Sequence, residues 1–246
     1  MQGAFKSGLF ALALALSALP ALAQSSRTTG SPADPWEGFN RAVYNVNDAL
    51  DAALLKPVAK GYQNTVPDPA REGVKNFFGN LGDVWSTVNL LLQGKVVESA
   101  RMTLRVASNT IFGLGGVLDP ATEFGLERHS EDFGQTLGFW GVPPGPYVVL
   151  PLLGPSTLRD TAALPVDFKG GGLNFVNDTG AVVTLSGLRV VSTRAGLLSA
   201  ERVLADVALD KYSFLRDAYL ARRRSLVYDG NPPEEPADAE PASAAQ

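Results

Sequence analysis

The chain of 246 residues contains no cysteine and only one histidine, His129. The first absence excludes disulfides and thiol nucleophiles, and together the two leave too few nitrogen and sulfur ligands for a zinc site. We therefore expect no metal and no cofactor. The formal net charge of −4 provides no positive field for nucleic acid. A chain of this length can still bury a sizeable core without cross-links.

Charged side chains are missing altogether from residues 133–158. The stretch is long enough to cross a bilayer as a helix, but its prolines prevent a continuous helix: Pro143, Pro144, Pro146, Pro151 and Pro155. Irregular backbone is tolerated at membrane depth only where protein covers it or where it lines a cavity. The stretch therefore belongs to the interior of a soluble domain or to a protein that sits partly in lipid.

Sequence signs of catalysis are weak. Gly113, Gly115 and Gly116 lack the third glycine of a dinucleotide loop, and no phosphate-binding P-loop occurs in the sequence. Ser156 does not lie in a nucleophile elbow and is better explained as a capping residue. His129 has acidic neighbours, but a capping or ion-paired role in a loop is favoured. We expect no enzyme, and a hydrolase that uses His129 and Ser156 is the least favoured alternative.

The two ends of the chain differ in composition from its body. Residues 1–23 are typical of a signal peptide, with a basic start, an apolar run and a small-residue cleavage site. Residues 24–33 form a Ser/Thr/Gly linker, and residues 229–246 form an acidic Pro/Ala tail that we expect to be disordered. The exported, folded domain is predicted to span residues 34–228.

Helical periodicity dominates this domain. Asp34 is placed to cap a helix whose apolar side carries Phe39, Val43, Val46 and Leu50. Only residues 147–150 resemble a strand, and residues 174–186 are compatible with helix or strand. Further helices are expected at residues 57–62, 70–78, 80–92, 95–112, 131–139, 156–163, 203–209 and 210–228, with a short one after Asp119. The predicted fold class is mainly α, in one domain of short helices broken by glycine and proline.

Arg222, Arg223 and Arg224 stand near the end of the last predicted helix. Three consecutive residues point in different directions around a helix, so they do not form a stripe. Interaction with the negative end of the helix dipole is the favoured interpretation. Contact with anionic lipid head groups or with an acidic partner is the alternative.

Three motifs in a fixed order carry a resemblance to a known family. They are residues 34–41 (DPWEGFNR) followed by Tyr44 and Asn45, residues 109–116 (NTIFGLGG) followed by Asp119, and residues 133–138 (FGQTLG) continuing through 145–147 to 158–160 (LRD). Together they resemble the MlaA/VacJ family over about residues 34–228. The chain departs from that family's pattern after the predicted signal peptide, where Ala21, Leu22, Ala23 and Gln24 stand in place of a lipidated cysteine.

The resemblance implies an α-helical ring with a central channel in the inner leaflet of the outer membrane of Gram-negative bacteria, and a C-terminal helix that reaches the periplasm. It implies removal of mislocalised phospholipids from the outer leaflet and their transfer to a periplasmic carrier, with a trimeric porin as membrane partner. The alternative is an exported adaptor that organises porins without moving lipid. Without a cysteine to carry acyl chains, we expect the apolar rim or a porin to hold the protein at the outer membrane, on its periplasmic side.

A lipid route needs a polar path beside an apolar surface, because burying an unpaired head-group charge is costly. The candidates for the polar lining of the channel are Asn40, Tyr44, Asn45, Asn47, Arg159 and Asp160. The candidates for an apolar belt that faces the membrane are Phe77, Phe78, Trp85, Leu90, Leu91, Leu92 and Trp140. A place in an ordinary hydrophobic core remains the alternative for each of the apolar residues.

Overall fold

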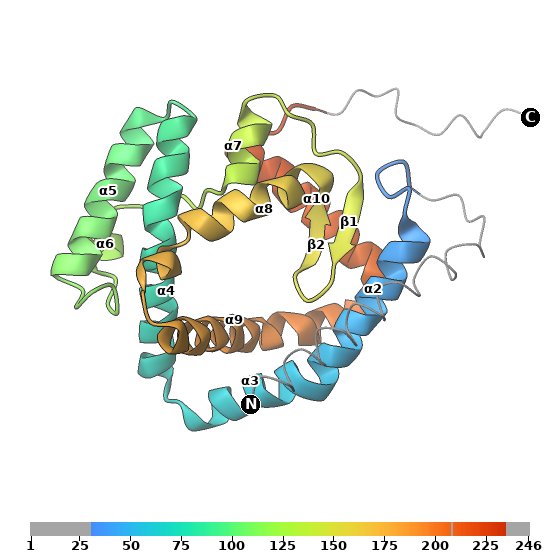
Figure 1. Cartoon of the computed structure of the whole chain (residues 1–246), viewed down its shortest axis with the longest axis horizontal. Helices are drawn as coiled ribbons and strands as arrows, with labels where there is room; N and C mark the ends of the chain where they lie inside the picture. Colours follow the sequence, from blue (N-terminus) through green and yellow to red (C-terminus); the bar gives the residue numbers. More distant parts are fainter. Residues whose placement is uncertain (1–30, 208, 235–246) are drawn as a thin grey trace, which may run out of the picture.

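The computed structural model describes residues 31–207 and 209–234 (Figure 1). The predicted signal peptide, residues 24–30 of the linker and residues 235–246 of the tail lie outside them. The prediction of a mainly α fold is confirmed. The helices are α2 (Glu37–Leu50), α3 (Lys56–Thr65), α4 (Asp68–Leu92), α5 (Val96–Ile111), α6 (Pro120–Glu123), α7 (Phe133–Phe139), α8 (Leu158–Gly170), α9 (Thr179–Val207) and α10 (Lys211–Val227), and the strands are β1 (Tyr147–Leu150) and β2 (Gly154–Thr157).

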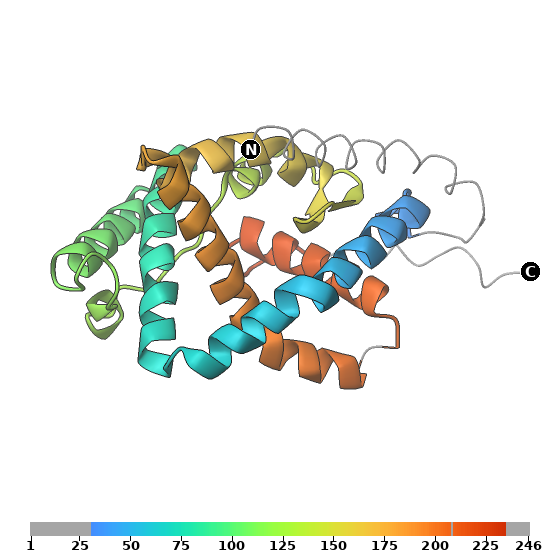
Figure 2. The same cartoon turned by 60° about the horizontal axis from the view of Figure 1, so that its bottom comes forward.

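The long helices form the frame of the molecule. In Figure 1, α2 and α4 stand at opposite sides, α3 runs along the bottom between them, and α8 and the β-hairpin lie across from α3. Helix α9 runs between α4 and α2, and it packs on both α3 and α4. Figure 2 shows α5 and α6 on the outer side of α4. The ring with a central channel implied by the resemblance stays a prediction.

Several predicted breaks are absent from the structure. Helix α2 continues into α3 through a single π-helical turn, Asp51–Leu55. Such a wider turn accommodates Pro57, which has no N–H to donate to the preceding turn. The predicted helices at residues 70–78 and 80–92 are one helix, α4. Gly79 lies inside this helix without ending it. The Arg128 guanidinium packs beside the glycine, 2.8 Å from where a Cβ would lie, so a larger side chain would collide with it.

The region after residue 130 also differs from the prediction. Helix α7 begins two residues later than predicted and is capped by Asp132, whose carboxylate accepts a hydrogen bond from the Gln135 amide. Strand β2 was not predicted, because Gly154 and Pro155 disfavour strands, but a two-stranded hairpin leaves edge positions where proline is accepted. The ambiguous residues 174–186 are helical from Thr179 onward, within α9.

Helix α2 buries one of its polar side chains and exposes part of its apolar side. Asn40 is completely buried, while Val46 and Leu50, on the apolar side, are about half exposed. Asp34 does not cap the helix as predicted. Its buried carboxylate accepts hydrogen bonds from Asn40 Nδ2 at 2.7 Å and from Tyr212 Oη at 2.5 Å, so it ties α2 to α10. The amphipathic helix is therefore correctly predicted, but of its apolar side only Val43 is buried, while Val46 and Leu50 stay exposed.

Helices α4 and α5 share this polarity. The buried face of α4 includes the polar residues Asn80, Asp83, Ser86 and Asn89, and that of α5 includes Ser99, Arg105 and Asn109. The exposed faces carry large apolar side chains, namely Val84, Val88, Leu91 and Leu92 on α4 and Val97, Leu104 and Ile111 on α5. A helix on the surface of a water-soluble protein has the opposite arrangement. Contiguous apolar surface of this kind is typical of contact with a membrane or another protein.

Among the described residues, one helical segment has the length and composition to cross a membrane, Thr179–Glu201 of α9. Most of its apolar residues are not buried inside the protein. It therefore differs from the core helix of a soluble protein, whose apolar side chains are covered. The segment adds to the outward-facing apolar surface of the frame.

Asn40 is expected to be essential for stability. Its side chain accepts from the Val149 amide at 2.8 Å and donates to the Tyr147 carbonyl at 3.1 Å, so α2 is fastened to β1. Asn40→Ala leaves buried polar groups unpaired and should lower the free energy of unfolding by about 2–4 kcal/mol. Urea unfolding of the detergent-solubilised protein measures the loss.

Asn45→Ala, at an exposed position of the same helix, is the control and should change the free energy of unfolding by no more than about 0.5 kcal/mol. Equal losses in the two variants would contradict the structural role of Asn40.

Candidate functional site

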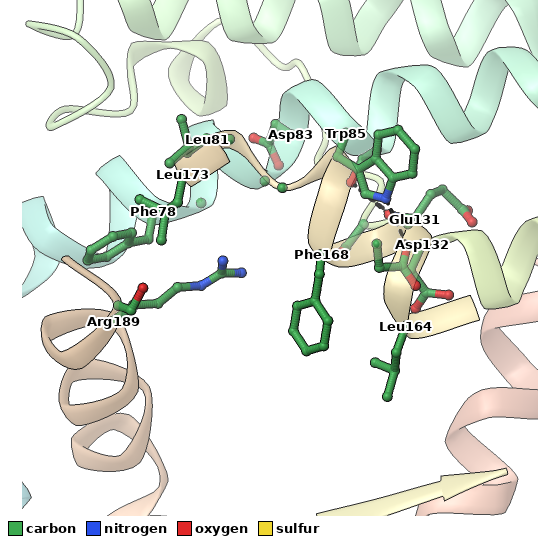
Figure 3. Close-up of a pocket in the computed structure, with 18 of the residues that line it drawn as sticks. Phe78, Leu81, Asp83, Trp85, Glu131, Asp132, Leu164, Phe168, Leu173 and Arg189 are labelled. Carbon is green, nitrogen blue, oxygen red and sulfur yellow. Dashed lines mark hydrogen bonds between the residues drawn. The ribbon is translucent and has the colours of Figure 1, made fainter. Parts of the chain in front are cut away.

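A cavity of about 770 Å³ lies between α4, α8, α9 and the loop that precedes α7 (Figure 3). Its volume falls in the range of about 300–1,000 Å³ common for small-molecule sites. One part of its lining is apolar and includes Phe78, Leu81, Leu164, Phe168, Leu173, Val182 and Val190. Another part is charged and includes Asp83, Arg128, Glu131, Asp132, Asp167 and Arg189. The cavity is thus amphipathic.

Asp83 anchors one corner of the charged wall. Its buried carboxylate lies 3.0 Å from Arg128 Nε and 3.4 Å from Arg105 Nε. Arg105 is itself buried and also pairs with Asp119, the cap of α6. These bonds connect α4, α5, α6 and the loop at Arg128, so the wall is held by side chains that the helices direct inward.

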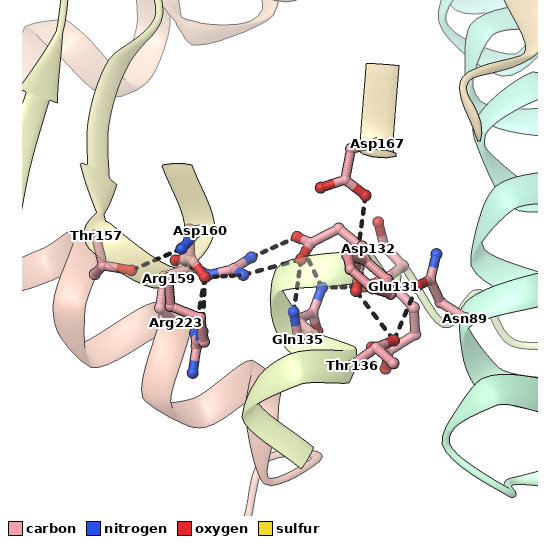
Figure 4. Close-up of polar contacts among 12 residues, drawn as sticks. Asn89, Glu131, Asp132, Gln135, Thr136, Thr157, Arg159, Asp160, Asp167 and Arg223 are labelled. Carbon is pink, nitrogen blue, oxygen red and sulfur yellow. Dashed lines mark hydrogen bonds and ion pairs between the residues drawn. The ribbon is translucent and has the colours of Figure 1, made fainter. Parts of the chain in front are cut away.

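Asp132 and Arg223 anchor the opposite corner (Figure 4). Arg223 Nη2 donates to Asp132 Oδ1 at 2.9 Å and to Asp160 Oδ1 at 3.0 Å, which joins α7, α8 and α10. Arg159 and Tyr219 complete the network by donating to Asp160, each at 3.0 Å. Burial by itself would raise the pKa of Asp132, but the hydrogen bonds and charge of Arg223 outweigh it and hold that pKa below its ordinary value.

Two other carboxyl groups of the wall have no cationic partner at bonding distance among the side chains that the structure describes. Asp167 accepts from the Phe133 amide at 2.7 Å and from Trp85 Nε1 at 2.8 Å, yet burial raises its pKa above the ordinary value. Burial likewise raises the pKa of Glu131, which accepts from Gln93 Nε2 at 2.9 Å. Both groups therefore favour their neutral forms more than exposed carboxyls do.

The predicted lining residues lie elsewhere, because hydrogen bonds hold them in the frame. Asn40 and Asn47 bind backbone groups of the β-hairpin, and Tyr44 packs edge-on against Tyr212. Asn45 is exposed. The remaining two, Arg159 and Asp160, belong to the buried network, and only Asp160 reaches a second, smaller cavity of about 130 Å³. All six are described, and none lines the 770 Å³ cavity.

The predicted belt residues are only partly on the outer surface. Leu91, Leu92 and Trp140 are exposed, each by 43% or more. Phe78 and Leu90 are only 7% and 1% exposed, so neither faces a surrounding membrane, and we correct their assignment to the belt. Phe78 instead contributes to the lining of the cavity. Trp85 lines the cavity and Phe77 is half-buried, with its ring against Phe78. The correction follows from the packing of α4, which buries part of its apolar surface together with its polar face.

Sequence reasoning missed the residues that do line the cavity. The helix predicted at residues 156–163 is too short to include Asp167 and Phe168, and the ambiguity at residues 174–186 concealed α9. The acidic residues before α7 were interpreted only as neighbours of His129. In the structure His129 is half-buried, and its backbone N–H contacts Met102 Sδ. The Ser156 hydroxyl is hydrogen-bonded to Thr161 rather than to His129. The sequence contained one indication of the cavity wall: Asp83 and Ser86 are three residues apart, so these two polar residues share one face of a largely apolar helical segment.

The arginine triplet was also interpreted differently from what the structure shows. Arg223 is largely buried between Asp132 and Asp160, so it stabilises the packing of α10 rather than the end of its dipole. Arg222 is exposed. The carboxylates of α7 and α8 that receive Arg223 are distant in sequence, so helical periodicity alone could not identify them.

The fold and the cavity define a helical protein with outward-facing apolar surface and an amphipathic cavity. Residues 32–226 match the family of MlaA lipoproteins. The chain is 38% identical over 239 residues to the intermembrane phospholipid transport system lipoproteins MlaA of Escherichia coli K12 and of Shigella flexneri, with 94% of each chain covered. The protein belongs to the MlaA family, and the resemblance noted in its motifs is confirmed.

More distant relatives and a solved structure agree with this assignment. The MlaA lipoprotein of Haemophilus influenzae is 34% identical over 202 residues, with 80% of each chain covered. A solved structure, described as the structural basis for maintenance of bacterial outer membrane lipid asymmetry, superposes with a TM-score of 0.70 at 35% identity. The superposition covers 79% of this chain and 98% of the other.

The Asp132–Arg223 pair predicts loss of stability in acid. The folded state lowers the pKa of Asp132. The contribution of the pair to the free energy of unfolding is therefore complete above the unfolded carboxyl pKa of about 3.9, and it decreases as pH falls through and below that value. Urea unfolding at about pH 6 and at successively lower pH measures it. Asp132→Asn should reduce the stability at pH 6 and flatten its decline in acid. The matched exposed variant Asp48→Asn should keep the wild-type slope, and an unchanged slope in Asp132→Asn would refute the role of the pair.

Proposed function

We propose that this protein is a passive phospholipid conduit of the outer membrane. It removes mislocalised phospholipids from the outer leaflet and hands them to a periplasmic carrier, and so maintains lipid asymmetry. The observation that carries the proposal is the amphipathic cavity of about 770 Å³ inside a frame whose helices expose apolar faces. Membership in a family whose relatives are named for intermembrane phospholipid transport supports it.

The two walls of the cavity match the two parts of a phospholipid. Acyl chains favour the surface of Phe78, Leu164 and Phe168, since apolar contact avoids exposure to water. A charged head group requires polar partners when it leaves water, and the charged side chains of the lining, which include Arg128 and Arg189, supply them. Such a site lowers the barrier for a head group to pass through an apolar layer. Transport of this kind breaks no covalent bond and requires no catalytic residue.

The outer surface supports a location in the outer membrane, on its periplasmic side. Leu104 and Ile111 of α5 are exposed by 59% and 70%, and Leu91, Leu92 and Trp140 extend the same apolar character. Covering such surface with hydrocarbon contributes about 25 cal/mol per Å². We propose that this rim holds the protein in the inner leaflet, together with a trimeric porin as partner. The helical frame then forms a ring, and the cavity is part of its channel.

The second candidate function is an envelope adaptor that organises porins without moving lipid. The exposed apolar face of α5 fits either a partner protein or lipid. The adaptor has no use for the cavity, whereas the conduit depends on it. Variants that fill the cavity but leave the outer surface unchanged therefore distinguish the two functions.

Val182→Trp tests the conduit. Val182 lines the cavity from α9, so an indole at this position fills the lipid site. We expect phospholipid that co-purifies with the detergent-solubilised protein to fall to background. In a strain that lacks the native gene, the variant should leave phospholipid in the outer leaflet, measured by labelling with a membrane-impermeant amine reagent.

Val183→Trp is the matched control. Val183 is the next residue of α9, but its side chain is exposed and is not part of the cavity lining. This variant should carry lipid and restore asymmetry like the wild type. Full asymmetry with Val182→Trp, while porin still co-purifies, would exclude the conduit and favour the adaptor.

The outer rim makes a separate prediction. Leu104→Glu combined with Ile111→Glu places charge on the apolar face of α5 and should release most of the protein from isolated outer membranes under carbonate and high-salt washes, because charged side chains resist transfer into hydrocarbon. Immunoblotting of the washed membranes measures retention. Leu104→Met combined with Ile111→Met keeps the surface apolar and should be retained. Equal retention of both variants would show that this face does not anchor the protein.

A further inference from the structure

Arg189 of α9 projects into the cavity (Figure 3). No ion pair or hydrogen bond joins its guanidinium group to any side chain that the structure describes, namely those of residues 31–173, 176–201 and 209–234. The other cation of the lining, Arg128, is paired with Asp83 at 3.0 Å. Arg189 is thus the cationic lining residue, within the described part of the chain, whose charge no carboxylate compensates.

The surroundings of Arg189 are mainly apolar. Figure 3 shows its side chain on the same side of the cavity as Phe78, Leu81 and Leu173, while Glu131 and Asp132 lie across from it. Arg189 is exposed, so water solvates its guanidinium group while the cavity is empty. A lipid that displaces this water places the cation beside hydrocarbon, which is costly unless the lipid itself supplies an anion. The position therefore favours a ligand that carries negative charge next to hydrocarbon.

We infer that Arg189 binds the phosphodiester group of the phospholipid held in this cavity, an inference that rests on the proposed function. A guanidinium group presents paired N–H donors that match two phosphate oxygens, and it stays charged in apolar surroundings. The acyl chains then lie against the apolar residues beside it. Arg189 is a binding residue that sets the depth and orientation of the lipid.

The carboxyl groups across the cavity are consistent with this placement. Arg223 compensates the charge of Asp132, and burial favours the neutral forms of Glu131 and Asp167. These three carboxyl groups therefore repel a phosphate group less than exposed, ionised carboxylates would, but they cannot bind it as a cation does. The α9 side is therefore the side of the cavity on which a phosphodiester finds an unpaired positive charge.

The experiment uses the full chain in detergent with three probes: dihexanoylphosphatidylglycerol, dihexanoylglycerol and inorganic phosphate. Trp85 lines the cavity, so its fluorescence reports occupancy once the two other tryptophans are replaced, Trp36→Phe and Trp140→Phe. We expect Arg189→Gln to weaken binding of the phosphatidylglycerol by about tenfold or more and to leave binding of dihexanoylglycerol unchanged. Arg189→Lys should recover part of the loss. Arg101→Gln, at an exposed arginine of α5 outside the cavity lining, should bind both lipids like the wild type.

The outcomes separate this inference from the proposed function. Wild-type affinity of Arg189→Gln for the phosphatidylglycerol would refute the role of Arg189 and leave the conduit standing. Failure of the unsubstituted protein to bind either lipid would refute both. Inorganic phosphate that binds as tightly as the lipid would assign the site to a free anion and overturn the inference. Thermal unfolding of each variant confirms that a loss of binding is not a loss of fold.

Discussion

The architecture depends on hydrogen bonds among buried polar side chains. Asn40 and Asp34 fasten α2 to the hairpin and to α10, Asp83 joins α4 to Arg105, and Asp132 and Asp160 receive Arg223. A buried polar group that loses its partner is costly, so these bonds determine how each helix is rotated. With polar faces inward, α4 and α5 present apolar side chains outward, and α2 does so at Val46 and Leu50. This arrangement is stable where an apolar phase covers the exterior.

The same rotation creates the functional site. Side chains that turn inward from α4 and from the loop before α7 provide the charged wall of the cavity, and α8 and α9 add apolar residues and Arg189. The site is therefore a consequence of the packing of the frame and not a separate element added to it. A protein built with polar residues inside and apolar residues outside has the organisation required for a polar ligand to cross an apolar layer.

Much of the fold was predictable from local patterns, but the site was not. The amphipathic helix at residues 37–50, the long helix of α5 and the strand at residues 147–150 were correctly predicted, since they depend on periodicity and capping. Periodicity identifies an apolar face without telling whether water, protein or lipid will cover it. Asn40 and Asn47 accordingly appeared suited to a channel, although they bind the hairpin, and Phe78 and Leu90 appeared suited to a membrane, although they are buried.

The sequence by itself determined the mainly α fold, through helical periodicity, and the family, through three motifs in a fixed order. It also determined that residues 133–158 could not form one continuous helix, because of their prolines. Only the tertiary structure decided that this stretch becomes α7, the hairpin and the entry to α8. It alone decided which charges meet, since Arg223 and Asp132, or Arg105 and Asp83, are separated along the chain and are paired by the packing of whole helices.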